Sequence, residues 1–320
     1  MWSIVFAVKA AVTLSLLWWL STKIDFSAMW AQFATGRAGL IVAGTLVLAL
    51  QPPLGALRWA LMLRRFGMRF PALSILRWTY AGAFINQVLP ATIGGDGLRA
   101  FMAQRADGRL ASVLASIVLE RVLLLLALVL LVLASAPRLD RLIAPRELAW
   151  LAVLLIAGTL AGAAFVLLAD RMPARWLRWR AARWLADFSQ DCRQLLQSPV
   201  LAGGLLALSL LSLLNIMASL TLFVIAFGGQ ADPLRILWLL PPVIAASNLP
   251  ISIGGWGTRE FAMVAVLGTA GVARETAILA SVWLGLAGIV ITLPGAFVHF
   301  SRRAAGAAVS PDASTKPSAP

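Results

Sequence analysis

The sequence predicts an all-α polytopic membrane protein with about six full spans, two re-entrant glycine-motif hairpins and an inverted internal repeat. The 320-residue chain is 61% hydrophobic and 12% charged, with a mean hydropathy of +0.88. A soluble domain could not bury that much apolar surface. A glycine-rich motif also occurs once in each half. Interrupted hydrophobic segments at corresponding places in two halves are typical of transporter repeats.

The repeated motif appears when residues 89–101 are aligned with residues 249–261. Eight of the thirteen positions are identical, and Gly254 lies 160 residues after Gly94. Clustered glycines and a proline interrupt a helix, so each copy is expected to form the turn of a hairpin rather than continue a span.

The remaining apolar runs predict six full spans, at residues 3–20, 38–62, 111–135, 148–168, 199–228 and 275–298. No small-residue cleavage site follows the first span, so we expect an uncleaved signal anchor and then a short polar loop. The second span contains Gln51-Pro52-Pro53 and should break there, because proline interrupts the helical ladder. Arg58, in the same span, is expected to anchor the helix at the membrane interface.

The two hairpins are predicted at residues 71–110 and 234–270. Irregular backbone is not tolerated in lipid, so each glycine turn should be buried in protein or line a wet cavity. The domain boundaries follow: a first half at 1–170, a basic linker at 171–198, a second half at 199–300 and a disordered tail at 301–320. The sequence of this linker predicts either an amphipathic helix that lies on an anionic leaflet or an ordinary helical connection between the halves.

The basic residues indicate the orientation. With the N-terminus inside, Lys and Arg are about twice as frequent in the predicted cytoplasmic segments as in the outer ones. Both termini are therefore expected in the cytoplasm. The first hairpin would then enter from the cytoplasm and the second from outside, which makes the halves inverted repeats.

Composition also narrows the chemistry. The formal net charge of +14 is spread in short blocks between apolar runs, so we expect no nucleic-acid partner. The single cysteine, Cys192, excludes an intrachain disulfide. With a single histidine, His299, neither a histidine-ligated metal nor a Ser-His-Asp triad is expected. The sequence predicts no cofactor, and it contains no P-loop motif for ATP.

Each motif copy offers the groups of an anion site. Backbone amides at glycines allow close approach of a ligand, and free amides at a helix start attract anions. Arg99 and Arg259 stand five residues after the first glycine and add a planar fork suited to phosphate. In a membrane, the corresponding anion is a lipid phosphate. The alternative is that the glycines only permit tight packing and the arginines sit at the interface.

Charged residues within the apolar segments are the other candidates. Glu120 and Arg121 are adjacent, so they point about 100° apart on a helix and should pair elsewhere. Glu120 with Arg99, and Asp96 with Arg121, are the open pairings. These acids would act as proton relays, as charge balance or as structural ion pairs.

The stretch from Asn86 to Arg99, then Glu120-Arg121, then the stretch from Leu249 to Glu260 resembles the flippase-like membrane domain of bacterial lysylphosphatidylglycerol synthases. The resemblance covers nearly the whole chain and includes stand-alone members of about this length. It implies movement of a lipid between leaflets of the bacterial inner membrane, with cargoes in the family that include phospholipids, polyprenyl-linked glycans and hopanoids. Only a short tail follows Arg303, so the aminoacyl-transfer domain and lipid lysinylation are not expected.

Lipid translocation is therefore the leading hypothesis, with membrane lipids and a lipid-biosynthesis enzyme as partners and no catalytic residues. The alternatives are a membrane-embedded enzyme using Asp96 or Glu120 as a base, and a scaffold for a lipid or glycan biosynthesis complex. The candidate substrate-binding residues are Asn86, Thr92, Gly94, Gly95, Asp96, Arg99, Glu120, Arg121, Ser252, Gly254, Gly255, Arg259 and Glu260.

Overall fold

The structure, a computed structural model, describes residues 25–88, 94–107, 109–139, 197–248 and 255–307, with isolated positions and short runs between 11 and 22 and between 153 and 193. All secondary structure in these ranges is helical. The predicted first span, the span at 148–168 and the basic linker lie mostly outside the described residues. Helix continues to Ala307, which includes the first residues assigned to the disordered tail.

Four helical segments in the described part of the chain are long and apolar enough to cross a membrane. They are Ala38–Arg65, Leu110–Pro137, Pro199–Ala226 and Arg274–Phe297. The corresponding helices are α3 (Ala38–Leu48) with α4 (Gln51–Arg65), α7 (Leu110–Leu139), α10 (Pro199–Ala226) and α13 (Arg274–Ala307). These agree with four of the six spans predicted from the sequence.

The second predicted span is broken, as the prolines predict. α3 ends at Leu48, and α4 begins at Gln51 with the prolines at its first positions. Proline has no backbone N–H, so it is accommodated at a helix start and not in the middle of a ladder. The predicted polar loop before this span is wrong in part, because it contains α2 (Phe26–Ala34). Asp25 starts that helix by accepting hydrogen bonds from the amides of Ser27 and Ala28 at 2.9 and 3.1 Å.

Each predicted hairpin region contains two helices, and the glycines of the first motif lie in the first turn of the second helix. The first is α5 (Ala72–Val88) with α6 (Gly94–Asp107), and the second is α11 (Pro233–Ser247) with α12 (Thr258–Gly268). At about 1.5 Å per residue, each of these helices is shorter than the roughly 30 Å of a hydrocarbon core. The turns at 89–93 and 249–254 lie outside the described residues.

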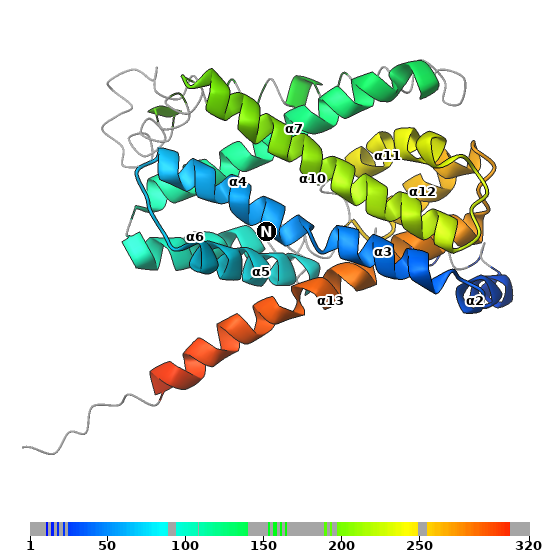
Figure 1. Cartoon of the computed structure of the whole chain (residues 1–320), viewed down its shortest axis with the longest axis horizontal. Helices are drawn as coiled ribbons and strands as arrows, with labels where there is room; N and C mark the ends of the chain where they lie inside the picture. The colour runs from blue at the N-terminus through cyan, green and yellow to red at the C-terminus, as the bar shows by residue number, and fades with distance from the viewer. Residues whose placement is uncertain are drawn as a thin grey trace, which may run out of the picture.

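The helices recur in the same order in the two halves. The set α3/α4, α5, α6 and α7 corresponds to α10, α11, α12 and α13, and the starts of α3 and α10, Ala38 and Pro199, are 161 residues apart. The colours in Figure 1 show α3/α4 and α13 running in one direction and α7 and α10 in the other. The long helices that correspond, α3/α4 with α10 and α7 with α13, therefore have opposite directions.

Contacts between α10 and α3/α4 confirm that these two segments are antiparallel. Ser219 Oγ donates to the carbonyl of Gly44 at 2.8 Å, and Asn215 Nδ2 donates to Gln51 Oε1 at 3.2 Å. The residue number thus rises along one segment as it falls along the other. The close approach depends on Gly44, since a β carbon there would lie 2.6 Å from the ring of Phe223.

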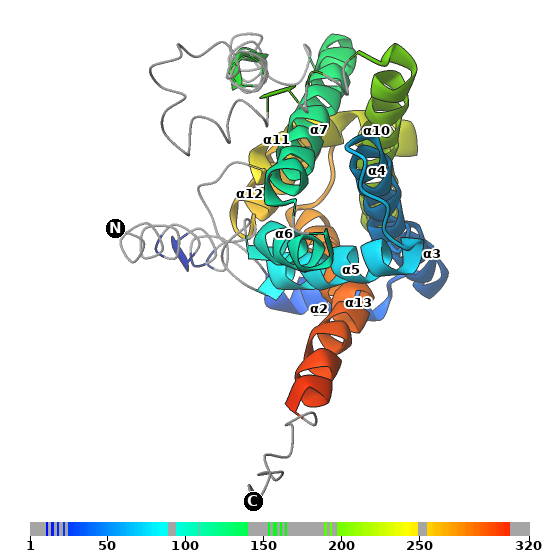
Figure 2. The ribbon, with the colours of Figure 1, turned by 90° about the vertical axis from the view of Figure 1, so that its left-hand side faces the viewer.

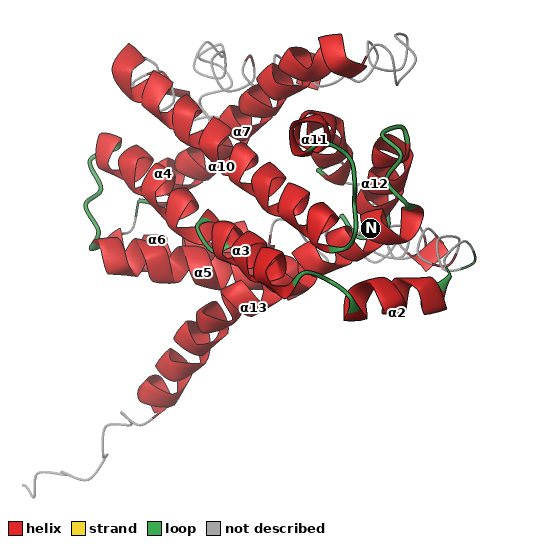
Figure 3. Cartoon of the chain, turned by 45° about the vertical axis from the view of Figure 1, so that its right-hand side comes forward, coloured by secondary structure: helices red, strands yellow, loops and turns green. Residues whose placement is uncertain are grey.

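The buried side chains form two clusters. One contains residues of α4, α5, α6 and α7, and the other joins α7 and α10 to α11, α12 and α13. Figure 2 shows α5 and α6 beneath α4 and α7, and Figure 3 shows the last part of α13 leaving the bundle. The first cluster surrounds the charged residues of the first motif.

Candidate functional site

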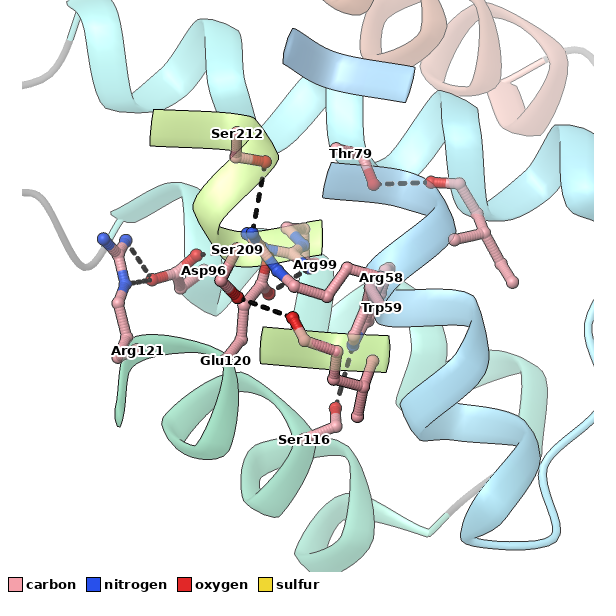
Figure 4. Close-up of polar contacts among 12 residues, drawn as sticks. Arg58, Trp59, Thr79, Asp96, Arg99, Ser116, Glu120, Arg121, Ser209 and Ser212 are labelled. Atoms are coloured by element: carbon pink, nitrogen blue, oxygen red, sulfur yellow. Dashed lines mark hydrogen bonds and ion pairs between the residues drawn. The ribbon is translucent and has the colours of Figure 1, made fainter. Parts of the chain in front are cut away.

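Three charged side chains from three helices meet inside the first half of the bundle. Arg58 of α4 donates from Nη2 to Glu120 Oε1 at 2.7 Å, and Arg99 of α6 donates from Nη2 to Glu120 Oε2 at 2.8 Å. All three side chains are buried, and Figure 4 shows Glu120 of α7 beside both guanidinium groups. One carboxylate therefore joins α4, α6 and α7.

A second pair extends this cluster toward the surface. Arg121 donates to Asp96 Oδ2 from Nε at 3.1 Å and from Nη2 at 2.6 Å. Asp96 Oδ1 also lies 3.4 Å from Arg99 Nη1. Both pairings that helix geometry left open in the sequence, Glu120 with Arg99 and Asp96 with Arg121, are therefore present.

The charges in this cluster do not balance. Three guanidinium groups face two carboxylates, so the five side chains of this cluster carry one positive charge in excess. The Nε atoms of Arg58 and Arg99 are buried and have no hydrogen-bond partner among the described residues. An unpartnered charged donor in a region of low dielectric constant is costly. The cluster therefore carries excess positive charge and two donors without a partner, both of them enclosed by protein.

Neighbouring side chains hold the guanidinium groups in place. The Arg99 guanidinium lies over the Trp59 ring, 4.2 Å from its centre, and Trp59 Nε1 donates to Ser116 Oγ at 2.8 Å. Arg58 Nη1 donates to Ser212 Oγ at 3.3 Å. Stacking a guanidinium on an aromatic face adds attraction while fixing its orientation.

The sequence-based role of Arg58 as an interfacial anchor is wrong. Arg58 is 4% exposed and forms the buried bridge to Glu120. The break before Gln51 and the packing of α4 on α7 bring it to that carboxylate. A signal for this role was present: a cation within an apolar span needs a counter-ion, and Glu120 lies within the neighbouring span of the same half.

Asn86 and Gly95 hold the first hairpin together. The amide of Gly95 donates to Asn86 Oδ1 at 2.9 Å. A β carbon on Gly95 would collide with the carbonyl oxygen of Gly82 and would lie 2.6 Å from Asn86 Oδ1. The space beside Gly95 is thus filled by protein, which agrees with the alternative that this glycine permits tight packing. Gly94 is the first residue of α6, and Thr92 lies outside the described residues.

The second motif builds a smaller cluster with balanced charge. Arg259 donates from Nε and Nη2 to Glu260 Oε1 at 3.2 and 3.0 Å, and also to the side chain and carbonyl of Ser281 at 2.7 and 2.9 Å. Glu260 Oε2 accepts from the amide of Gly257 at 2.6 Å, which caps α12. Gly255 and Gly257 have φ of +79° and +86°, a region that favours glycine.

Ser252 and Gly254, the other candidates in this copy, lie outside the described residues. One cation and one acid face each other here, compared with three cations and two acids in the first copy. No hydrogen bond or ion pair among the described residues links the two motif arginines, Arg99 and Arg259.

A family model described as the lysylphosphatidylglycerol synthase transmembrane region matches residues 6–295. The chain belongs to this family. Its function is accordingly connected with membrane lipids, and its apolar helices are those of a multi-pass membrane protein. A comparison with curated proteins found no match.

In this member of the lysylphosphatidylglycerol synthase transmembrane family, both motif regions contact the same part of α13. A β carbon on Gly285 would lie 2.7 Å from the Trp256 ring and 3.1 Å from Arg259 Nη2. One on Gly288 would lie 2.5 Å from Gln87 Nε2. These two glycines are one turn apart, so the end of α5 and the start of α12 converge on a single notch of small residues.

Proposed function

We propose that the chain is a lipid translocase that moves a lipid with an anionic or phosphate-bearing headgroup between the leaflets of the bacterial inner membrane. The observation that carries the proposal is the buried cluster of Arg58, Arg99 and Glu120, with Asp96 and Arg121 beside it. A permanent excess of positive charge inside an apolar bundle is expensive, and intramembrane charges typically mark a pathway for substrate or ions. Membership of a lipid-related membrane family supports the same conclusion.

The proposed topology is an inverted repeat with both termini in the cytoplasm. The long corresponding helices run in opposite directions, and the short hairpin helices suit re-entrant segments that approach from opposite faces. The small-residue notch of α13, contacted by both motif regions, would lie near the middle of the membrane. The lipid would move down its gradient or with ions carried by the buried acids Asp96, Glu120 and Glu260.

In this mechanism the headgroup phosphate competes for guanidinium groups that carboxylates hold in the resting state. In the first half, Arg99 would release Glu120 and bind the phosphate. In the second half, Arg259 would release Glu260 in the same way. Exchange between carboxylate and phosphate is plausible physically because both accept paired hydrogen bonds from a guanidinium. A lipid-biosynthesis enzyme would supply the cargo on one side of the membrane.

Leaflet exchange by reconstituted protein tests this proposal. The assay would follow a labelled anionic phospholipid, with Arg99→Lys and Arg259→Lys as variants. Lysine keeps the charge but cannot form the paired hydrogen bonds of a guanidinium. Losing about 2–4 kcal/mol of interaction free energy with the phosphate should slow exchange by roughly 30-fold or more. Arg235→Lys, at the exposed start of α11, is the matched control.

Wild-type exchange rates in both motif variants would contradict a role of these arginines in binding the headgroup.

Mass spectrometry of the lipids from the same vesicles tests the enzymatic alternative, because a chemical step would leave an altered headgroup. We expect no altered lipid. Glu120 and Asp96 each face two guanidinium groups, so both carboxylates are already engaged in ion pairs.

A further inference from the structure

Arg121 lies deep in a spanning helix. It is eleven residues after Leu110 and sixteen before Pro137, which places it about 16 Å and about 24 Å from the ends of the apolar segment of α7. Both distances put the residue within the hydrocarbon core of a bilayer roughly 30 Å thick if α7 crosses it. A cation at this depth is costly and needs a counter-charge.

Arg121 is nevertheless not enclosed by the described part of the protein. Its side chain is 48% exposed, unlike the buried Arg58 and Arg99. Val118 and Leu125, which are 38% and 37% exposed, lie three residues before and four residues after it on the same face of α7. The exposed face therefore consists of apolar side chains with one guanidinium between them.

The contacts of Arg121 leave part of this charge unmatched. Nε and Nη2 bond to Asp96 Oδ2, whereas Nη1 has no hydrogen-bond partner among the described residues. Asp96 also faces Arg99, so its single negative charge is shared between two cations. Figure 4 shows Arg121 at the outer edge of the cluster, with Asp96 on its inner side.

We propose that the exposed face of α7 around Arg121 is a lateral docking site for a lipid with one phosphodiester charge. The phosphate would bind Arg121 and bring the charge of the cluster to zero, while acyl chains would lie along Val118 and Leu125. The occupant is a lipid rather than free phosphate, because the guanidinium is reached across an apolar face. The site rests on the proposed function for its class of ligand, but a lipid can reside here without crossing the membrane.

Asp96 competes with the phosphate for Arg121 in this arrangement. Removing the charge of Asp96 should therefore strengthen lipid binding, whereas removing the charge of Arg121 should abolish it. A purely structural Asp96–Arg121 bridge makes a different prediction. In that case the two variants lose the same contact, and their effects should have the same sign.

The test measures the retention of phosphatidylglycerol by purified full-length protein in nanodiscs, against a background of phosphatidylcholine. We expect Arg121→Gln to lower retention about tenfold or more and Asp96→Asn to raise it several-fold. Arg69→Gln, which removes an exposed cation from the loop after α4, should leave retention unchanged. Equal changes in Arg121→Gln and Arg69→Gln, or changes of one sign in Arg121→Gln and Asp96→Asn, would overturn the proposal.

A second variant keeps the test decisive if Arg121→Gln does not fold. Leu125→Glu places a carboxylate one turn from Arg121, where it repels the phosphate and competes with it for the guanidinium, so it should also lower retention. Unchanged retention in Leu125→Glu would contradict the docking site. Excess inorganic phosphate should not displace the lipid, and efficient displacement would show that the site binds free phosphate instead.

Discussion

Glu120 Oε2 lies 2.8 Å from Arg99 Nη2, although the two residues are 21 positions apart and belong to different helices. The other oxygen of the same carboxylate accepts from Arg58 Nη2 at 2.7 Å. The packing of α4, α6 and α7 in the first half is thus tied to a single buried acid. In the described part of the second half, Arg259 pairs with its own neighbour Glu260 and both bond to Ser281, so this cluster joins α12 to α13.

We expect Glu120→Gln to destabilise the protein strongly. The amide leaves Arg58 and Arg99 buried without their shared counter-charge, and breaking a buried ion pair in this way costs about 3–5 kcal/mol. Thermal unfolding in detergent measures the effect. Glu275→Gln, in the first turn of α13, is the control and should cost only a few tenths of a kcal/mol. Similar melting temperatures in both variants would show that Glu120 does not hold the helices together.

Arg58→Lys should also be destabilising, by about 1–3 kcal/mol. A lysine ammonium cannot reproduce the fork that reaches Glu120 and Ser212 from two nitrogens of one guanidinium. The matched control is Arg64→Lys in the last turn of the same helix, where the side chain is exposed. An arginine that only anchors α4 at an interface would tolerate lysine at both positions, so equal stability would contradict the buried role.

Gly95 and Gly97, near the start of α6, should respond differently to alanine. At Gly95 the new methyl group would meet the carbonyl of Gly82 and the side chain of Asn86, and such overpacking costs about 1–3 kcal/mol. At Gly97 nothing lies within 4 Å, so Gly97→Ala should be neutral or stabilise the helix by roughly 0.5–1 kcal/mol. Melting temperatures of the two variants, measured side by side, check the prediction. A tolerated Gly95→Ala would mean that the α5–α6 contact is looser than described.

The sequence was sufficient for features that depend on local chemistry. Proline at positions 52 and 53 predicted the break between α3 and α4, and the glycine motifs predicted both helical hairpins. The 3.6-residue period separated Glu120 from Arg121 and so predicted their different partners. In each case a residue acts on its own helix or its own turn.

Features that depend on packing between apolar helices could not be predicted in the same way. Hydropathy alone did not show which side of α3 or α10 meets a neighbour, because both helices are strongly apolar. The buried stripe of Ser212, Asn215 and Ser219 on α10 was a signal that went unused. For this reason the buried positions of Arg58, Trp59 and Ser212 were not recognised as parts of the site. The difference in net charge between the two clusters also emerged only when Arg58 was placed beside Glu120.

The orientation of the whole chain can be tested with its single cysteine. Cys192 lies outside the described residues, and its location is predicted from the basic linker at 171–198, which should be cytoplasmic by the positive-inside rule. A membrane-impermeant maleimide should therefore fail to label it in intact cells and should label it in inverted vesicles. The matched control is Thr35→Cys in a Cys192→Ser background, at the exposed end of α2 on the predicted outer side. That cysteine should react in intact cells. The reverse pattern would invert the topology. Three spans are predicted between positions 35 and 192, which places the two cysteines on opposite sides of the membrane. Labelling of both from one side would contradict this number of crossings and the inverted repeat that depends on it.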